Sequence, residues 1–218
     1  MVQQFQARRR AALWRTLPNL AFGSYVLALR SLLAGCRSVL DVGCGDRSPI
    51  RFVDLDVSVG VDGFAPGLRL ASGRRTHSAF VQSDVRAVGN LFRSKSFDAC
   101  VALDLVEHLE QSDGINLIHA LESISRRCVI LFTPNGFIPQ SDTANDLQLH
   151  KSGWTVGTLR DLGYSVSGVY GSKSLRGEHH DLRYRPKLAS GVLSLLTHVL
   201  WTSKHPQRSA ALLAVKSV

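Results

Sequence analysis

Short apolar runs alternate with segments of helical periodicity through the first two-thirds of the chain. The first run lies in 38–46, and the later ones span 57–61, 79–81, 97–104 and 128–132. Short runs rich in Val, Leu, Ile and Phe predict buried strands. Strands that alternate with helices need crossover connections, so the pattern predicts an α/β fold with a mostly parallel sheet covered by helices on both faces.

The pattern changes on either side of this region. Residues 5–34 are typical of one or two helices broken near Pro18, with Gly35 as a helix stop. The segment 137–151 is polar and lacks a clear period, which is typical of a functional loop. Further elements are predicted as a helix from Ser152 or Thr155 to Leu162, a strand over 164–170, a helix over 188–201 and a last strand over 210–215.

The segment 38–46 combines an acid with two closely spaced glycines, Asp41, Gly43 and Gly45. A buried strand that turns into a helix beneath a nucleotide has this form. Glycine lets the backbone approach a ligand because it has no Cβ, and the N–H groups at the following helix start can bind that ligand. The segment therefore predicts a nucleotide-binding turn if further polar groups lie at the same sheet edge.

Acidic residues also stand at the carboxyl ends of the next strands. Asp62 comes about 20 residues after the glycine turn, where an acid bonds the two ribose hydroxyls of an adenosine ligand. Asp84 follows the third strand and can accept a hydrogen bond from an adenine amino group, and Asp104 ends the fourth. Each acid alone is explained as well by a helix cap or a turn. Together with Asp41 they favour a ligand site, because parallel strands end at one edge.

These strand-end motifs resemble those of the class I S-adenosylmethionine-dependent methyltransferases, from Val39 to Gly136. The resemblance implies a Rossmann-like fold with a seven-stranded sheet, a last strand antiparallel beside the fifth, and S-adenosylmethionine as the cofactor. It implies these cofactor-binding residues: Asp41, Gly43, Cys44, Gly45, Asp62, Gly63, Asp84, Val85, Leu103 and Asp104. The chain departs from an NAD-type fingerprint at Ser48, where a third glycine is absent, and this argues against a dinucleotide. It departs at Arg47 from methyltransferases that have a third glycine there.

Length and composition favour one domain. The chain has 218 residues, 44% of them hydrophobic and 20% charged, which suffices for one substantial core. We expect a single methyltransferase domain over 1–218, with an N-terminal helical segment (1–35), a cofactor-binding core (36–136) and an acceptor-side loop with closing strands (137–218). The apolar stretch 188–201 is too short and too often interrupted by polar residues to span a membrane, which takes about 20 residues.

The net charge of +9 favours an acidic partner, such as a nucleic acid, an anionic membrane face or a phosphorylated substrate. The basic residues fall in small groups, for which a solvated surface is the simplest explanation. The basic N-terminal helix is a candidate for covering the site, for dimerisation or for contact with lipid headgroups at the inner membrane face. The four cysteines are scattered, which predicts free thiols in a reducing cytoplasm.

Methyl transfer from a sulfonium needs in-line placement, exclusion of water and, for a hydroxyl acceptor, removal of a proton. His108, after the fourth strand, and His150, in the polar loop, are the candidate bases because histidine titrates near neutral pH. We assign no metal. The alternative is a divalent ion held by Asp104, Glu107 and His108, which would share one face of a helix. Some ubiquinone-biosynthesis O-methyltransferases have two acids and a histidine at the spacing of Asp104, Glu107 and His108. The adjacent histidines 179–180 are expected to be solvated and not to bind a metal.

The segments 150–154, 170–171 and 175–178 resemble a bacterial subgroup of these enzymes associated with surface polysaccharide and glycolipid assembly. The resemblance implies a hydroxyl on a small-molecule or glycan acceptor, with or without a phosphate or a lipid. Trp154 is expected either to stack on a sugar or to pack in the core, and Arg176 to pair with a phosphate. Two alternatives stay open: RNA methylation, although the chain lacks an Asn-Pro-Pro-Tyr type motif, and a noncatalytic cofactor-binding partner of an enzyme.

Overall fold

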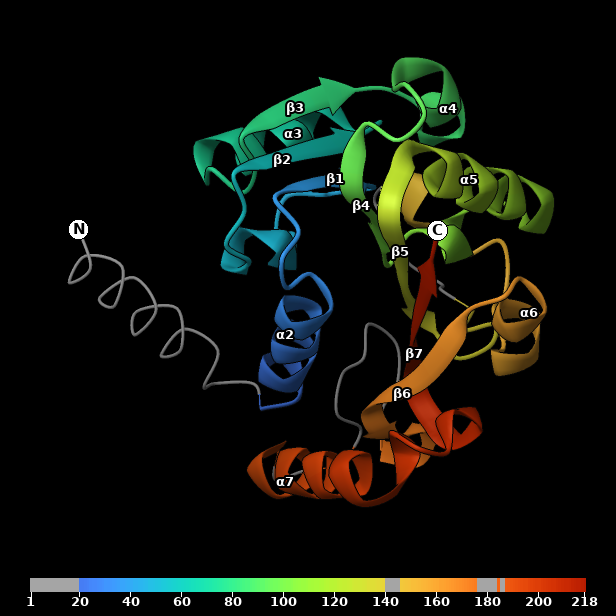
Figure 1. The fold of residues 1–218 in the computed structure, drawn as a ribbon. Helices are drawn as coiled ribbons and strands as arrows, with labels where there is room; N and C mark the ends of the chain where they lie inside the picture. The colour runs from blue at the N-terminus through green and yellow to red at the C-terminus, as the bar shows by residue number, and fades with distance from the viewer. Residues whose placement is uncertain (1–19, 140–145, 176–183, 185–186) are drawn as a thin grey trace.

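Seven strands form one sheet in the computed structural model, which describes residues 20–139, 146–175, 184 and 187–218 (Figure 1). The strands are β1 (Ser38–Val42), β2 (Val57–Asp62), β3 (Ala79–Gln82), β4 (Phe97–Leu103), β5 (Ser125–Pro134), β6 (Ser165–Ser172) and β7 (Ser209–Ser217). Their spatial order is β3-β2-β1-β4-β5-β7-β6. The first five strands run parallel, and β7 lies antiparallel between β5 and β6. This arrangement confirms the predicted Rossmann-like methyltransferase fold.

The strand order reverses between β1 and β4. The chain builds outward from β1 to β3, then crosses back and adds β4 on the other side of β1. Val42 of β1 is in register with Val61 of β2 and with Ala102 of β4, so these strands end at one edge. In an open parallel sheet, ligands bind in the crevice beyond such an edge, at the point of reversal.

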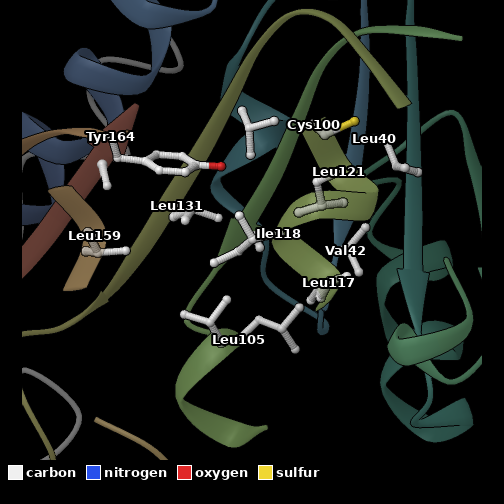
Figure 2. Close-up of a cluster of buried hydrophobic side chains, with 14 of the residues drawn as sticks. Leu40, Val42, Cys100, Leu105, Leu117, Ile118, Leu121, Leu131, Leu159 and Tyr164 are labelled. Carbon is white, nitrogen blue, oxygen red and sulfur yellow. The ribbon is translucent and has the colours of Figure 1, made fainter. Parts of the chain in front are cut away.

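Helices cover both faces of the sheet and enclose two hydrophobic clusters. They are α2 (Leu20–Leu32), α3 (Ala65–Gly73), α4 (Val88–Leu91), α5 (Gln111–Ile124), α6 (Val156–Asp161) and α7 (Lys187–Thr197). Successive strand residues point to opposite faces, so Val39 and Leu40 of β1 enter different clusters. Val39 packs with Leu29 of α2, whereas Leu40 packs with Leu117 and Leu121 of α5 (Figure 2).

Two boundaries differ most from the sequence prediction. β5 begins at Ser125, before the predicted Cys128, because pairing with β4 extends back to Ser125. The helix predicted over 188–201 is α7, which ends at Thr197 and continues as the π-helical turn His198–Thr202. No helix in the described part of the chain is both long enough and apolar enough to cross a membrane. The predictions for residues 1–19, for Arg176 and for 179–180 lie outside the described residues.

The four cysteines carry free thiols, as predicted. Three of them, Cys36, Cys44 and Cys100, are buried, and Cys128 is half-buried. Burial raises the pKa of the Cys100 thiol to about 12 and that of Cys128 to about 11. These two thiols therefore stay protonated at neutral pH and are poor nucleophiles.

Candidate functional site

A cavity of about 690 Å³ lies at the carboxyl ends of β1, β2, β3 and β4. The loops after these strands and the segment 147–151 line it together. Its volume is within the range of sites for small ligands and cofactors. Strand ends that are distant in sequence thus meet at one cavity, at the edge where the strand order reverses.

The glycine turn after β1 forms one part of the cavity wall. Gly43 has a φ of +72° and Gly45 a φ of +53°, which glycine adopts without steric cost. A Cβ on Gly43 would lie only 2.6 Å from Cδ1 of Leu105. The backbone N–H of Gly43 donates to the carbonyl of Val61 at 2.8 Å. At Gly45 nothing lies within 4 Å of the Cβ position. The backbone at Gly45 is therefore open to a ligand.

The carboxylate of Asp62, at the end of β2, is fixed by two backbone donors. Its Oδ2 accepts the N–H of Gly45 at 2.9 Å, and its Oδ1 accepts the N–H of Phe64 at 2.8 Å. Each oxygen keeps a second lone pair, so both can also accept from ligand hydroxyls. The half-buried Asp62 lines the cavity, and this geometry suits a ribose with two hydroxyls.

Asp84 follows β3 and pairs with Arg86. Its Oδ1 accepts the backbone N–H of Arg86 at 2.9 Å, and the guanidinium Nε lies 3.0 Å from both carboxylate oxygens. The hydrogen bond from this guanidinium holds the pKa of Asp84 below its usual value, so the carboxylate is charged. Both residues line the cavity. No sequence motif places a cation beside this acid, so Arg86 could not be predicted.

Asp104 and Glu107, after β4, form a carboxyl pair. Asp104 has a φ of +53°, a conformation that aspartate adopts more readily than most residues. Glu107 is 2% exposed, and Oγ1 of Thr133 donates to its Oε2 at 3.0 Å. Burial, and then the charge of Asp104, raises the pKa of Glu107 well above its usual range, and the two carboxyl groups share a hydrogen bond. Glu107 is the donor in that bond when it is protonated, because an ionised carboxylate only accepts.

His108 and His150 lie side by side although they come from different loops. Their ring centroids are 4.8 Å apart. Nδ1 of His108 donates to the carbonyl of Leu149 at 3.3 Å, and Nδ1 of His150 donates to the carbonyl of Ile138 at 2.7 Å. Burial, and then the neighbouring His150, lowers the pKa of His108, which keeps its imidazole neutral at neutral pH. Glu107 and the two histidines each offer one ligand atom, and these atoms all lie within 4.8 Å of one another.

Most of the predicted cofactor residues reach the cavity. Those that line it are Gly43, Gly45, Asp62, Gly63, Asp84, Val85 and Asp104. Cys44 and Leu103 are buried and do not line it. Of the candidate bases, His108 lines the cavity, whereas His150 does not and contacts the ring of His108.

The ligand cluster among the described residues differs from the alternative metal set predicted from the sequence. It contains His150 in place of Asp104, beside Glu107 and His108. The predicted set required one helix through residues 104–108. The structure has only a 3₁₀ turn over Val106–His108 here, so the expected i, i+3, i+4 face does not form.

Asp41 does not reach the cavity wall, contrary to the sequence prediction. It is 1% exposed, and its Oδ2 accepts hydrogen bonds from Oγ of Ser48 and from Nε2 of His77, the latter at 3.0 Å. The reason is its place inside β1, in register with Gly60 of β2 and short of the strand end. A Cβ on Gly60 would lie 3.1 Å from Nδ1 of His77, so the glycine makes room for this network. His77 belongs to no sequence motif, so its bond to Asp41 could not be predicted.

Trp154 packs in the core, so the alternative of stacking on a sugar is wrong. Its side chain is fully buried, and a Cβ on Gly114 of α5 would lie 2.6 Å from its Cζ2. The indole N–H donates to Oγ of Ser152 at 3.1 Å, and that hydroxyl donates to the carbonyl of Val106 at 3.2 Å. These contacts tie the loop after β5 to the 3₁₀ turn after β4.

Carboxylates outnumber cations on the cavity wall. The acids are Asp46, Asp62, Asp84, Asp104, Glu110 and Asp113, whereas the bases are Arg86 and Lys151. Apolar side chains, among them Phe64, Leu70 and Leu109, line other parts of the wall. The cavity therefore favours a ligand with a cationic centre and an apolar part, although the whole chain carries +9.

The central part of the chain matches a known domain family. Residues 40–136 match the family described as "Methyltransferase domain". The matched residues run from β1 to just past β5, and include the loops after β1 to β4 that line the cavity. A sequence comparison with curated proteins finds no match.

In structure the chain is similar to several methyltransferases. A SAM-dependent methyltransferase from Archaeoglobus fulgidus superposes with a TM-score of 0.56 at 17% identity, over 88% of this chain and 94% of that one. The methyltransferase domain of bacterial CtHen1 superposes with a TM-score of 0.55 at 19% identity, over 89% and 97% of the two chains. The small RNA methyltransferase HEN1 superposes with a TM-score of 0.57 at 18% identity, over 89% of this chain and 25% of that one. At these identities the likeness shows a shared fold.

Proposed function

We propose that this chain, whose residues 40–136 form a methyltransferase domain with S-adenosylmethionine as its cofactor, methylates a hydroxyl of a small-molecule or glycan acceptor. The observation that carries the proposal is the acidic cavity at the switch point of the sheet. S-adenosylmethionine carries a sulfonium and an ammonium group against one carboxylate, so it is a net cation. Six carboxylates against two basic side chains on the wall suit such a ligand.

The site residues have distinct roles in this proposal. Asp62 binds the ribose hydroxyls, since backbone N–H groups hold its two oxygens and each oxygen keeps a lone pair for the ligand. The open backbone at Gly45 faces the methionine part, and Asp84 with Val85 faces the adenine. Asp41 supports the site without contacting the ligand, because its bonds to Ser48 and His77 hold the glycine turn.

The proposed reaction is a direct methyl transfer. The acceptor oxygen forms a bond to the methyl carbon while the carbon–sulfur bond breaks, and the bonding electron pair stays on sulfur to give S-adenosylhomocysteine. The hydroxyl proton must leave, and the cavity wall at His108 is where the structure offers a neutral imidazole. A neutral imidazole of this kind can take up the hydroxyl proton as a base, or it can bind a metal ion as a ligand.

The electrostatics favour a hydroxyl on an uncharged part of the acceptor. A phosphate inside the cavity would face an excess of carboxylates, which opposes it. A phosphate or lipid group of a glycan-type acceptor would therefore lie outside the cavity. Lys151 and Arg86 are the lysine and arginine side chains among the described lining residues that could pair with such a group.

Calorimetry and a labelling experiment test the proposal. Wild-type protein should bind S-adenosylhomocysteine, and absence of binding would refute the cofactor assignment. Radiolabelled S-adenosylmethionine incubated with cell extract should place label in the small-molecule or glycan fraction in a base-stable, ether-type linkage. Label confined to esters or amines would overturn the hydroxyl assignment.

RNA methylation is the second candidate, and the excess of 26 basic over 17 acidic residues favours it. It predicts RNA binding that weakens steeply between low and moderate salt, because phosphate contacts release counterions. Filter binding at two salt concentrations, with label recovered in the RNA fraction, would establish it. RNA binding with no label in RNA would leave the glycan or small-molecule acceptor in place.

A further inference from the structure

We propose that Glu107, His108 and His150 bind one divalent transition-metal ion at the cavity wall, and that this ion holds the acceptor hydroxyl. The second half of the proposal rests on the proposed function, whereas the metal site itself does not. The three residues come from the turn after β4 and the loop after β5, and their ligand atoms lie within 4.8 Å of one another.

Both imidazoles are oriented as metal ligands usually are. A carbonyl oxygen only accepts, so the bonds to the carbonyls of Leu149 and Ile138 place the proton on Nδ1 of His108 and of His150. The lone pair then resides on Nε2 of each ring. Ligating histidines typically donate their other N–H to a backbone carbonyl, which fixes the ring and its tautomer. The two rings, with centroids 4.8 Å apart, meet this condition together.

The carboxyl group of Glu107 completes the set. Its side chain is almost fully buried, and Thr133 donates to Oε2 at 3.0 Å. As an ionised ligand, the buried Glu107 would need a compensating positive charge, and no Lys or Arg in the described chain pairs with it, so the metal ion would supply that charge. The N–H groups of Lys151 and Ser152 bond to the carbonyl of Glu107 at 2.8 and 3.1 Å, which fixes the loop next to His150.

The geometry and ligand types select a class of metal. Bonds of about 2.0–2.2 Å in tetrahedral arrangement place ligand atoms roughly 3.3–3.6 Å apart, so the largest separation in the set would shorten by up to about 1.5 Å on binding. Two imidazoles with one carboxylate suit Mn²⁺, Fe²⁺, Co²⁺ or Zn²⁺ better than Mg²⁺ or Ca²⁺. His108 lines the cavity, so the remaining coordination positions would face the acceptor. Asp104 is not one of the clustered ligand residues.

The ion would supply the acid–base chemistry of the transfer. A hydroxyl oxygen bound to it has a lowered pKa and loses its proton to water. The resulting oxygen attacks the methyl carbon, and sulfur leaves with the electron pair of the broken bond. In this state both histidines act as ligands and not as bases.

Cobalt binding tests the site without any activity assay. Protein treated with EDTA and then dialysed is titrated with Co²⁺, followed by visible absorption and by calorimetry. Wild type should bind one Co²⁺ with an intense visible band of low-coordinate cobalt, and His150→Ala should bind it at least ~100-fold more weakly because a ligand is lost. The control is His119→Ala, which removes an exposed histidine of α5 and should match wild type. Absence of stoichiometric binding, or a His150→Ala variant that binds like wild type, would overturn the site.

Thermal unfolding of each variant shows that it is folded. If His150→Ala fails to fold, His150→Asn keeps a polar group that can still bond to the loop and takes its place in the titration. Methyl transfer with and without EDTA tests the second half of the proposal. Transfer that is undiminished in EDTA overturns the role of the ion and leaves the proposed function intact. Cobalt binding with no transfer to any acceptor, while S-adenosylhomocysteine still binds, overturns the proposed function and leaves the site.

Discussion

Replacing Asp62 by alanine should weaken cofactor binding far more than it weakens the fold. The carboxylate is proposed to accept two ribose hydroxyls, and a hydrogen bond to a charged group is worth about 1.5–3 kcal/mol. Loss of both gives about 3 kcal/mol or more, which corresponds to roughly a 100-fold higher Kd for S-adenosylhomocysteine. Asp62→Asn keeps one acceptor oxygen and loses the charge, so about a tenfold weakening is expected.

The contacts of Asp62 set the cost to the fold. Its two oxygens accept the N–H groups of Gly45 and Phe64, and these donors lose their partner in the alanine variant. Gly45 is half-buried and Phe64 is exposed, so water can replace the lost acceptor at least in part. The expected loss of unfolding free energy is therefore only about 1–2 kcal/mol.

Calorimetry with S-adenosylhomocysteine and urea unfolding measure the two effects separately. Asp56→Ala is the matched control, because Asp56 precedes β2 at the opposite sheet edge, is exposed and pairs with Arg37. A surface pair of this kind contributes little, so this variant should keep both its affinity and its stability. The reasoning fails if Asp62→Ala loses stability while its Kd stays within about threefold of wild type, since the carboxylate would then serve the turn alone.

Two further substitutions test the contacts beneath the site. Gly60→Ala places a Cβ 2.8 Å from Sγ of Cys44 and 3.1 Å from Nδ1 of His77, and should cost about 1–3 kcal/mol in a urea titration. Adding Cys44→Ala should recover part of that loss, and no recovery would contradict the assigned clash. Trp154→Ala removes a fully buried side chain and should cost about 3–5 kcal/mol in a urea titration. A raised Km for a sugar acceptor with full stability would instead indicate a sugar contact.

The mostly parallel sheet and the acids at its edge could be predicted from the sequence, and the antiparallel last strand from the family resemblance. Each strand end carries a local signal, such as the two glycines after β1 or Asp62 after β2, and parallel strands necessarily end at one edge. No long-range contact has to be known for this inference. Asp84 and Asp104 reach the cavity for the same reason. The burial of Asp41 away from the cavity could not be predicted, because it depends on a residue of another strand. Gly60 of β2 leaves the space that His77 fills beside Asp41.

The pairing of His108 with His150 depends on the path of the loop after β5, and no periodicity specifies that path. The loop is fixed by contacts between distant residues, above all the bonds from Lys151 and Ser152 to the carbonyl of Glu107. The buried Trp154 holds Ser152 in place through its indole N–H. The tryptophan that resembled a sugar-binding residue thus acts on the site indirectly, since it anchors the loop that brings the second imidazole to the first. The acceptor side of such a site is therefore determined by core packing as much as by the residues that face the acceptor.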